Sequence, residues 1–388
     1  MDLFAVATAK FTLELYRQLR ESNNNIFYSP ISMMKTLAIL LLGAKANTVQ
    51  QIKKVLHFNE TTKKTTEKSA DSHVRSGNVH KQFQMVMTHL NNSNNAYDLK
   101  APNSIYGAKD FPFLQTFLKD IRKYYQANVE SLDFAHAAEE SQKKINSWMA
   151  RQTNGKIKDL FPSGSISSST ILVLVNAVYF KGQWNHKFDE KHTTEEKFWL
   201  NKNTGKPVQM MKQRNKFNFL FLEDVQAKIV EIPYTGKELS MFILLPVEID
   251  GLKKFEEQLT ADKLLEWTRA ENMHMTELYL SLPRFKVEEK YDLQVPLKHM
   301  GMVDAFDPQK ADFSSMSSTQ GLVVSKVLHK SFVEVNEEGA EAATAMSVET
   351  RSLSASKPND FSCNHPFLFV MKQNKTNSML FFGRVSSP

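Results

Sequence analysis

The early part of the chain shows the spacing of apolar residues that is typical of amphipathic helices. Near the N-terminus, one helical stripe consists of Phe4, Ala7, Phe11, Leu15 and Leu19. Ser29 and Pro30 precede an apolar run, and we predict a helix that begins there, because serine caps helices well and proline suits the first turn. Residues 44–56 and 138–149 repeat the amphipathic spacing and are predicted to be helices as well.

The later part of the chain changes to the pattern of strands. Residues 171–180, with the sequence ILVLVNAVYF, form a continuous apolar run rich in branched and aromatic side chains, which predicts a strand covered on both faces. Further strands are predicted at residues 241–245, 278–282, 333–335, 367–371 and 379–384. Early helices and late strands without regular alternation indicate an α+β fold.

The chain offers no obvious point of division. Its 388 residues would allow two or three domains, but it contains no internal repeat and no linker rich in proline or glycine. We therefore predict that residues 1–388 form a single domain. Residues 59–81 are polar and poor in apolar side chains, so we predict a mobile loop there.

Composition and the N-terminal sequence bear on the cellular compartment. Hydrophobic residues make up 41% of the chain and charged residues 23%, as in a soluble globular protein, and no apolar run has the length of a membrane span. The N-terminus lacks the features of a secretory signal, and Cys363 is the only cysteine, so no intrachain disulfide can form. We expect a monomer in the reducing cytoplasm with no membrane partner.

The net charge of +7 changes this picture little. An excess of positive charge can indicate an anionic partner such as a nucleic acid or a polyanionic sugar. The lysines are scattered along the chain, however, and no compact basic block occurs. We therefore favour a solvated basic surface and expect no nucleic-acid partner.

Motifs of the common catalytic sites are missing. The sequence has no GxSxG, P-loop, HExxH or paired CxxC motif, and its eleven histidines lack the spacing of metal ligands. Cys363, Asn364 and His365 are the residue types of a thiol protease, but three consecutive residues rarely give a nucleophile and a base the required geometry. We predict that the chain is not an enzyme, that it holds no metal or cofactor, and that Cys363 is a partly buried apolar residue.

The stretch at residues 333–363, VEVNEEGAEAATAMSVETRSLSASKPNDFSC, is unusual both as a strand and as a loop. Its small side chains bury too little area for a core strand, whereas a plain loop would carry more Gly, Asn and Asp. A segment that is exposed first and later joins an existing sheet would explain both features. Gly339 offers the backbone freedom that a hinge requires.

The charges in this stretch support insertion, because alternate side chains of a strand face opposite ways. An inward face without charge would consist of Ala340, Ala342, Thr344, Met346, Val348, Thr350 and Ser352. An outward face with every charge would consist of Glu341, Ala343, Ala345, Ser347, Glu349, Arg351 and Leu353.

The beginning of this stretch resembles the hinge of inhibitory serpins. The hinge comprises Glu337, Glu338, Gly339, Ala340, Glu341, Ala342, Ala343, Thr344 and Ala345. Other segments that resemble the family are NIFYSPIS at 25–32, NAVYFKGQW at 176–184, LPRF at 282–285, NHPF at 364–367 and FGR at 382–384. The two ends of the chain resemble the ovalbumin-like intracellular branch, and within it the hinge and residues 363–388 are similar to the squamous cell carcinoma antigens.

This resemblance implies a serpin fold, in which mixed β-sheets pack with about eight or nine helices and residues 337–360 form the hinge and an exposed reactive loop. By motif, the residues that control opening of the sheet in this family fall on Ser29, Ser32, Asn176 and His329. The resemblance also implies a protease inhibitor that acts by suicide covalent trapping, with insertion of the cleaved loop.

Three cleavage registers stay open. Counting from Gly339 as the family does places the reactive bond at Leu353–Ser354, and an apolar leucine favours chymotrypsin-like serine proteases of the cathepsin G or chymase type. Cleavage after Ser354 would suit a papain-like cysteine protease, and cleavage after Arg351 would suit a trypsin-like protease. A non-inhibitory serpin that acts as a binding protein is the alternative of another class, although the inward hinge positions lack the bulky or charged residues that would favour it.

Overall fold

The computed structural model describes residues 2–58, 72–91, 97–338 and 359–388, with side chains described from Val79 onwards in the second range. The helices in these residues are α1 (Leu3–Leu19), α2 (Pro30–Gly43), α3 (Ala46–Val55), α4 (Ser72–Asn91), α5 (Gln115–Tyr124), α6 (Ala138–Gln152), α7 (Leu252–Gln258), α8 (Ala261–Trp267) and α9 (Gln294–Met300). The strands form two sheets, so the predicted α+β fold is confirmed.

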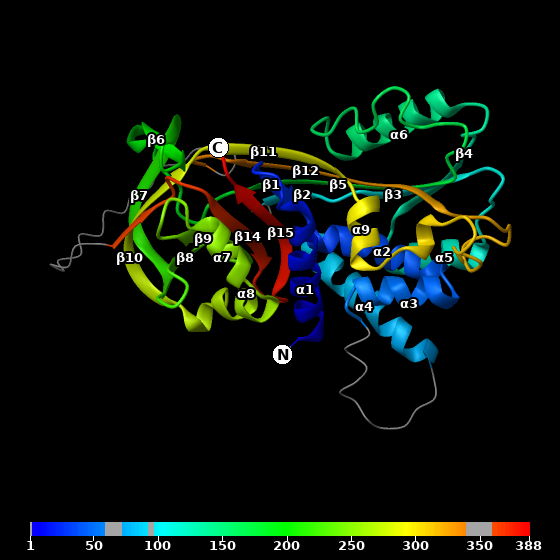
Figure 1. The fold of residues 1–388 in the computed structure, drawn as a ribbon, viewed down its shortest axis with the longest axis horizontal. Helices are drawn as coiled ribbons and strands as arrows, with labels where there is room; N and C mark the ends of the chain where they lie inside the picture. The colour runs from blue at the N-terminus through cyan, green and yellow to red at the C-terminus, as the bar shows by residue number, and fades with distance from the viewer. Residues whose placement is uncertain (1, 59–71, 92–96, 339–358) are drawn as a thin grey trace.

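One sheet has nine strands in the order β1-β15-β14-β9-β8-β7-β10-β13, with β6 paired to β7. Its strands are β1 (Ile26–Tyr28), β6 (Thr194–Asn201), β7 (Thr204–Leu222), β8 (Ala227–Pro233), β9 (Leu239–Pro246), β10 (His274–Pro283), β13 (Asn359–Ser362), β14 (Phe367–Gln373) and β15 (Ser378–Val385). This sheet lies toward one end of the molecule, on the left in Figure 1.

The other sheet has six strands in the order β11-β12-β5-β3-β4, with β2 paired to β5. Its strands are β2 (Tyr97–Lys100), β3 (Asn103–Ala108), β4 (Asn128–Leu132), β5 (Leu172–Gly182), β11 (Phe285–Asp292) and β12 (Val324–Val335). The long strands run along the length of the molecule, with α6 on one side of the sheet and α2 and α9 on the other (Figure 1).

The predicted start of α2 and the predicted central strand are both confirmed. The Ser29 side chain caps α2 by accepting a hydrogen bond from the backbone N–H of Ser32, and Pro30 occupies the first turn. β5 is buried along almost its whole length. Its Val173 and Val175 pack in a smaller apolar cluster together with residues of α6, and Leu174 belongs to the main core on the opposite face.

The structure differs from the predicted loop at residues 59–81, because residues 72–81 form the first turns of α4. The apolar positions that anchor α4 begin only later, with Phe83, Val86 and Leu90, all of which are buried. Once these side chains fix the helix, extending it toward the N-terminus adds one hydrogen bond per residue and costs little. Residues 59–71 lie outside the described part of the chain.

The centre of the six-stranded sheet is a parallel pair between two antiparallel neighbours. β12 runs parallel to β5, from Val324 opposite Leu172 to Val333 opposite Phe180. We call this pair the seam. On its two sides, β11 is antiparallel to β12 and β3 is antiparallel to β5.

Candidate functional site

A row of polar side chains crosses the seam on the face toward α2. The strand register places Asn103 of β3 opposite Asn176 of β5. It also places Asn176 opposite His329 of β12. All three side chains are buried. We call them the polar row. Asn176 is unusual within β5, because its other residues from Leu172 to Phe180 are apolar or aromatic.

The beginning of α2 lies against the polar row and contacts both strands of the seam. The backbone N–H of Ser29 donates to Nε2 of His329 over 3.1 Å. The side-chain amide of Asn176 donates to the carbonyl oxygen of Ser32 over 3.1 Å and also to the Ser32 hydroxyl. One helix start therefore holds β12 through Ser29 and β5 through Ser32. The four residues predicted by motif lie together in space.

The hydrogen bonds fix the tautomer of His329. Because Nε2 accepts from a backbone N–H, the ring proton resides on Nδ1, which donates across the seam to the side-chain oxygen of Asn176. Burial lowers the pKa of His329 to about 3. The ring is therefore neutral at neutral pH, and its two nitrogens join three segments: α2, β12 and β5.

Two further members of this network were not identified from the sequence. The amide of Asn176 donates to the side-chain oxygen of Asn103 over 2.7 Å, and the hydroxyl of Thr36 donates to the same oxygen. The amide nitrogen of Asn103 is buried without a hydrogen-bond partner among the described residues. Only the pairing of β3 with β5 brings Asn103 to this place, and the local sequence around it carries no signal of that pairing.

A second cluster holds the end of β12, where the predicted hinge begins. Glu337 is buried and accepts from Nε of Arg284 over 2.7 and 2.8 Å and from the Thr193 hydroxyl over 2.6 Å. Its carbonyl oxygen accepts from the backbone N–H of Phe188 over 3.0 Å. The indole N–H of Trp184 donates to the carbonyl oxygen of Asn336 over 2.9 Å and completes the cluster. We call it the Glu337 anchor.

The Glu337 anchor favours the ionised carboxylate. Burial alone raises the pKa of Glu337, but the hydrogen bonds from Arg284 and Thr193 outweigh burial and hold the pKa below the usual value of a glutamate. The forked contact with Arg284 is the strong, charge-assisted kind. The anchor therefore fixes the last residues before Gly339, the predicted hinge glycine, at neutral pH.

The predicted reactive bond lies outside the described residues. Leu353, Ser354, the alternative bait Arg351 and the hinge residues Gly339 to Ala345 all fall between Glu338 and Asn359. The described chain resumes in β13, so Asn359 and Asp360, which we predicted to end the loop, already belong to a strand. Both ends of the gap lie at the same end of the molecule (Figure 1).

Cys363, Asn364 and His365 do not form a nucleophile and base pair. Cys363 is fully buried rather than partly buried, and burial raises the pKa of its thiol. His365 contacts the carbonyl oxygen of Pro246 over 2.6 Å and the side chain of Asn364 over 2.9 Å. Both ring nitrogens are thus engaged by other groups, which indicates a structural role.

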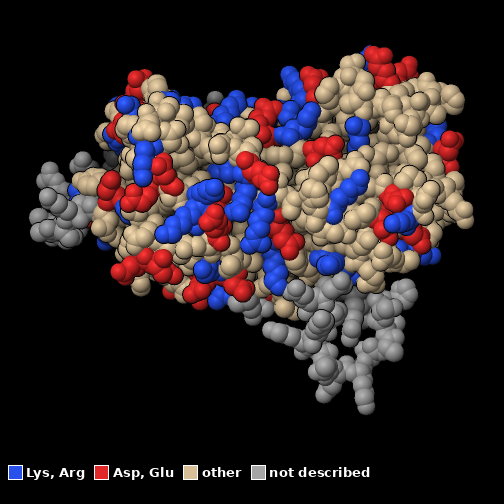
Figure 2. Space-filling view, in the orientation of Figure 1, with Lys and Arg blue, Asp and Glu red and all other residues tan. Residues whose placement is uncertain are grey.

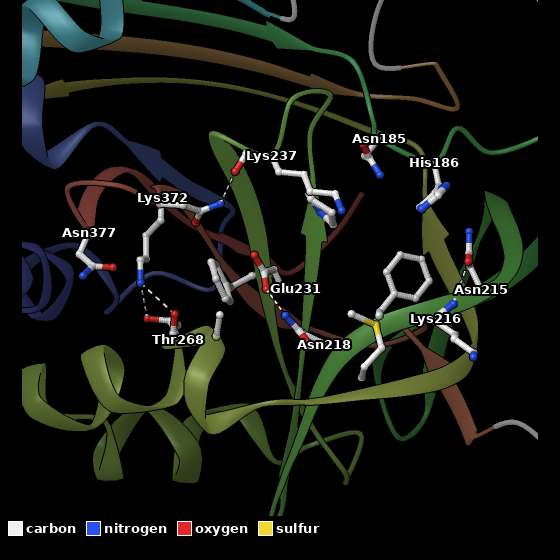
Figure 3. A pocket seen from close by; sticks show the side chains of 16 residues that line it. Asn185, His186, Asn215, Lys216, Asn218, Glu231, Lys237, Thr268, Lys372 and Asn377 are labelled. Atoms are coloured by element: carbon white, nitrogen blue, oxygen red, sulfur yellow. Dashed lines mark hydrogen bonds between the residues drawn. The ribbon is translucent and has the colours of Figure 1, made fainter.

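A cavity of about 450 Å³ lies where β7, β8 and the segment after α8 meet (Figure 3). Lys372 points to Thr268 and donates to its carbonyl oxygen over 2.8 Å. Glu231 accepts from Asn218 over 2.8 Å and from Ser240 over 2.8 Å. These ionisable groups bond to the protein's own side chains and backbone, as buried polar groups of a scaffold do.

The family model described as serpin (serine protease inhibitor) matches residues 6–388. The chain belongs to the serpin family. Human serpin B4 is 60% identical and human serpin B3 is 59% identical to this serpin, each over 391 aligned residues that cover the whole of both chains. Human leukocyte elastase inhibitor is 44% identical, again over both complete chains.

Solved structures show the same fold. Uncleaved ovalbumin matches this serpin with a TM-score of 0.90 at 35% identity, covering 99% of this chain and 100% of that one. A structure described as a tumour suppressing serpin matches with a TM-score of 0.88 at 33% identity over both complete chains. The serpin fold predicted from the sequence motifs is therefore confirmed.

Neither a group of metal ligands nor a membrane-spanning helix occurs among the described residues. Within the ranges 2–58, 72–91, 97–338 and 359–388, no three His, Cys, Asp or Glu side chains are grouped so that they could hold a metal ion. In the same part of the chain, none of the helices combines the length and the apolar character needed to cross a membrane.

Proposed function

We propose that this serpin inhibits proteases by suicide covalent trapping, and that Leu353–Ser354 is the bond offered to the protease. The observation that carries the proposal is the parallel seam. One of its two strands, β12, leads directly into the predicted loop. In the proposed reaction a protease cleaves the loop and stays bound as an acyl-enzyme, and the cleaved loop then becomes a new strand of the six-stranded sheet.

The sheet topology allows one position for such a strand. A segment that turns back after β12 must run antiparallel to β12. One side of β12 is already paired with the antiparallel β11, so the new strand has to lie on the other side, where β5 now lies. Insertion therefore separates β5 from β12. It replaces one parallel pair with two antiparallel pairs, which are somewhat more stable per residue.

The polar row lies in the path of the inserting strand. Insertion must break the hydrogen bond between His329 and Asn176, because these side chains meet across the seam. Buried hydrogen bonds of this kind are costly to leave unmade, so they keep the seam closed until a new strand can take their place. The Glu337 anchor would hold the adjacent end of β12 fixed while the chain beyond it moves.

The length of the seam fits the proposed movement. The loop from Gly339 to Ser352 has about 14 residues and would span roughly 48 Å as a strand. β12 and β5 have 12 and 11 residues, so an inserted strand would follow the seam from end to end. A protease attached at Leu353 would be carried to the opposite end of the molecule, where deacylation fails if its oxyanion hole is distorted.

Leu353 supports chymotrypsin-like serine proteases of the cathepsin G or chymase type as the target class. An apolar side chain before the scissile bond suits their apolar specificity pocket. Papain-like cysteine proteases that cut after Ser354 and trypsin-like proteases that cut after Arg351 are the competing targets. We propose that residues 1–388 act as one monomeric inhibitor in the cytoplasm.

The decisive experiment compares two single substitutions at neighbouring hinge positions. Ala342→Glu places a charge on the inward face of the proposed strand, and Ala343→Glu places the same charge on the outward face. After incubation with chymotrypsin, cathepsin G, papain or trypsin, denaturing electrophoresis should show a covalent complex for the unaltered serpin and for Ala343→Glu. Ala342→Glu should be cleaved without a complex.

The same gels can also show the result that would contradict the proposal. Cleaved serpin without a covalent complex for the unaltered chain, with every protease of the panel, would overturn the inhibitor proposal. That result would favour a non-inhibitory serpin that acts as a binding protein. Mass spectrometry of the released peptide decides which of the three registers is cut.

A further inference from the structure

The solvent face of β7, β10 and β13 presents large side chains to water. Met275, Glu277 and Tyr279 alternate along β10 and therefore share one face of the strand. Met275 is 64% exposed and Tyr279 is 46% exposed. Scattered apolar residues on a surface need no explanation, but two on one face of one strand, next to a proposed reactive loop, suggest a contact surface.

Arg214 of β7 fixes the position of the Tyr279 ring. The strand register places Arg214 directly opposite Tyr279. The guanidinium group lies over the ring, 5.5 Å from its centroid, and Nε of Arg214 donates to Glu277 over 3.0 Å. The ring is thus held between its strand and a cation that is itself held by a carboxylate. A preordered tyrosine loses little conformational freedom when a partner covers it.

This surface lies beside the point where the chain returns from the reactive loop. β13 begins at Asn359, which pairs with Leu278, and its next residue Asp360 pairs with Tyr279. Leu353 precedes Asn359 by six residues, so even a fully extended chain separates the two by roughly 20 Å. A globular domain of about 200 residues is roughly 40 Å across. A protease that holds Leu353 is therefore large enough to reach the end of the molecule that carries β13 and β10.

We propose that Met275, Tyr279 and Arg214 form a secondary docking surface for the body of the same protease that cleaves the loop, and that this contact speeds association. This inference rests on the proposed inhibitory function. Tyr, Met and Arg are the residue types that are enriched where protein interfaces gain most of their affinity. We call the three residues the β10 platform.

The chemistry of the surface favours an apolar, uncharged partner patch on the protease. The charges on this surface nearly balance. The cations Lys212, Arg214 and Lys216 of β7 lie near the carboxylates Glu196, Glu277 and Asp360, and Lys228 of β8 donates to the carbonyl oxygen of Asp360 over 3.2 Å. Lys212 pairs with Glu196, and Arg214 pairs with Glu277. Figure 2 likewise shows basic and acidic side chains mixed at the end of the molecule that carries β6 and β7. Contact between apolar groups, rather than long-range attraction, should set the effect on the rate.

The test is the second-order association rate constant of a Met275→Ala/Tyr279→Ala variant. The protease is whichever of cathepsin G, chymase and chymotrypsin the unaltered serpin inhibits fastest. The matched control is Val295→Ala, which truncates a side chain that is 60% exposed on α9, far from this end. We expect an association rate about ten-fold lower for the double variant and within about two-fold of the unaltered rate for the control. Tyr279→Phe in the otherwise unaltered chain keeps the ring and should keep the rate.

Further measurements distinguish a failure of this inference from a failure of the proposed function. The covalent complex and the stoichiometry should be the same for all variants, and the ten-fold difference should persist at low and high salt. An equal rate for the double variant and the control would overturn the β10 platform while leaving the inhibitor intact. A difference that vanishes at high salt would also overturn it, because the contact would then be electrostatic. Failure of the unaltered chain to form a complex would instead overturn the function itself.

Discussion

The two sheets of this serpin are held together in different ways. In the nine-stranded sheet, β14 pairs antiparallel with both β9 and β15, and all three strands are buried along their whole length. In the six-stranded sheet, the central pair is parallel and carries the polar row. Separating the strands of the nine-stranded sheet would lose their apolar contacts, whereas the hydrogen bonds across the seam of the six-stranded sheet can be remade with a new strand. In the mechanism proposed above, the nine-stranded sheet keeps its strand order and the six-stranded sheet exchanges strand partners.

The largest effect should come from a cavity in the nine-stranded sheet. Phe382 of β15 is fully buried and packs edge-on against Tyr16, with ring centroids 4.9 Å apart. Phe382→Ala should lower the free energy of unfolding by about 3–5 kcal/mol. Because this sheet keeps its order in our account, urea unfolding should show a similar loss in the intact and the loop-cleaved protein. A loss confined to the intact form would remove the distinction between the sheets.

The next effect should come from the seam. His329→Ala leaves the backbone N–H of Ser29 and the side-chain oxygen of Asn176 without their partner, which should cost about 3 kcal/mol in the intact protein. We expect a smaller loss in the cleaved protein, where the inserted strand separates β12 from β5. His136→Ala, at a side chain that is 85% exposed, is the control. Equal losses in both forms would contradict the role of the seam.

The seam also predicts a pH dependence. The pKa of His329 is lowered from its ordinary 6.5 to about 3 by burial, so below pH 6.5 the unfolded chain takes up a proton that the folded chain does not. Stability should therefore fall as the pH drops from 6.5 toward 3. Urea titrations at several pH values should show that His329→Ala lacks this component.

The Glu337 anchor should give a smaller effect. Glu337→Gln removes the charge-assisted contact with Arg284 and should cost about 1–2 kcal/mol at pH 7. Because the folded pKa of Glu337 lies below the ordinary 4.5, the stabilisation is present above pH 4.5 and is lost as the pH falls through the folded pKa. Glu338→Gln, at the next residue outside the anchor, is the control. A stability difference between Glu337→Gln and the unaltered serpin that stays constant down to pH 3 would argue against the ion pair.

The smallest effect should come from Thr36, at the edge of the polar row. Thr36→Val removes a hydroxyl that donates to Asn103 while it keeps the shape of the side chain. We expect a loss of about 1 kcal/mol in the intact protein by urea unfolding. An unchanged stability would show that the Thr36 hydroxyl adds nothing to the hydrogen bond that Asn103 accepts from Asn176.

Local features of the sequence predicted individual helices and strands well. The cap at Ser29 and the continuous apolar run of β5 depend on neighbouring residues alone, so the pattern was sufficient. The α4 helix was missed, and residues 72–81 were predicted to be a loop, because the first turns of the helix are polar and depend on the packing of Phe83 further along. Helix length in such cases is set by tertiary contacts, which single-sequence patterns do not contain.

The polar row could be predicted only in part. Motif resemblance identified Ser29, Ser32, Asn176 and His329, and the structure brings these four together. Asn103 belongs to the same network through strand register, a relation between residues 73 positions apart. No local property of the sequence encodes that pairing, so composition and periodicity could not reveal it.

The measurement that tests the account most directly is the melting temperature of the intact protein and of the same protein cleaved in its loop. If the cleaved loop inserts between β12 and β5, the nicked protein should melt more than about 10 °C above the intact one, because two antiparallel strand pairs replace one parallel pair. Equal melting temperatures, or a lower one after cleavage, would contradict strand insertion and the inhibitory mechanism that depends on it.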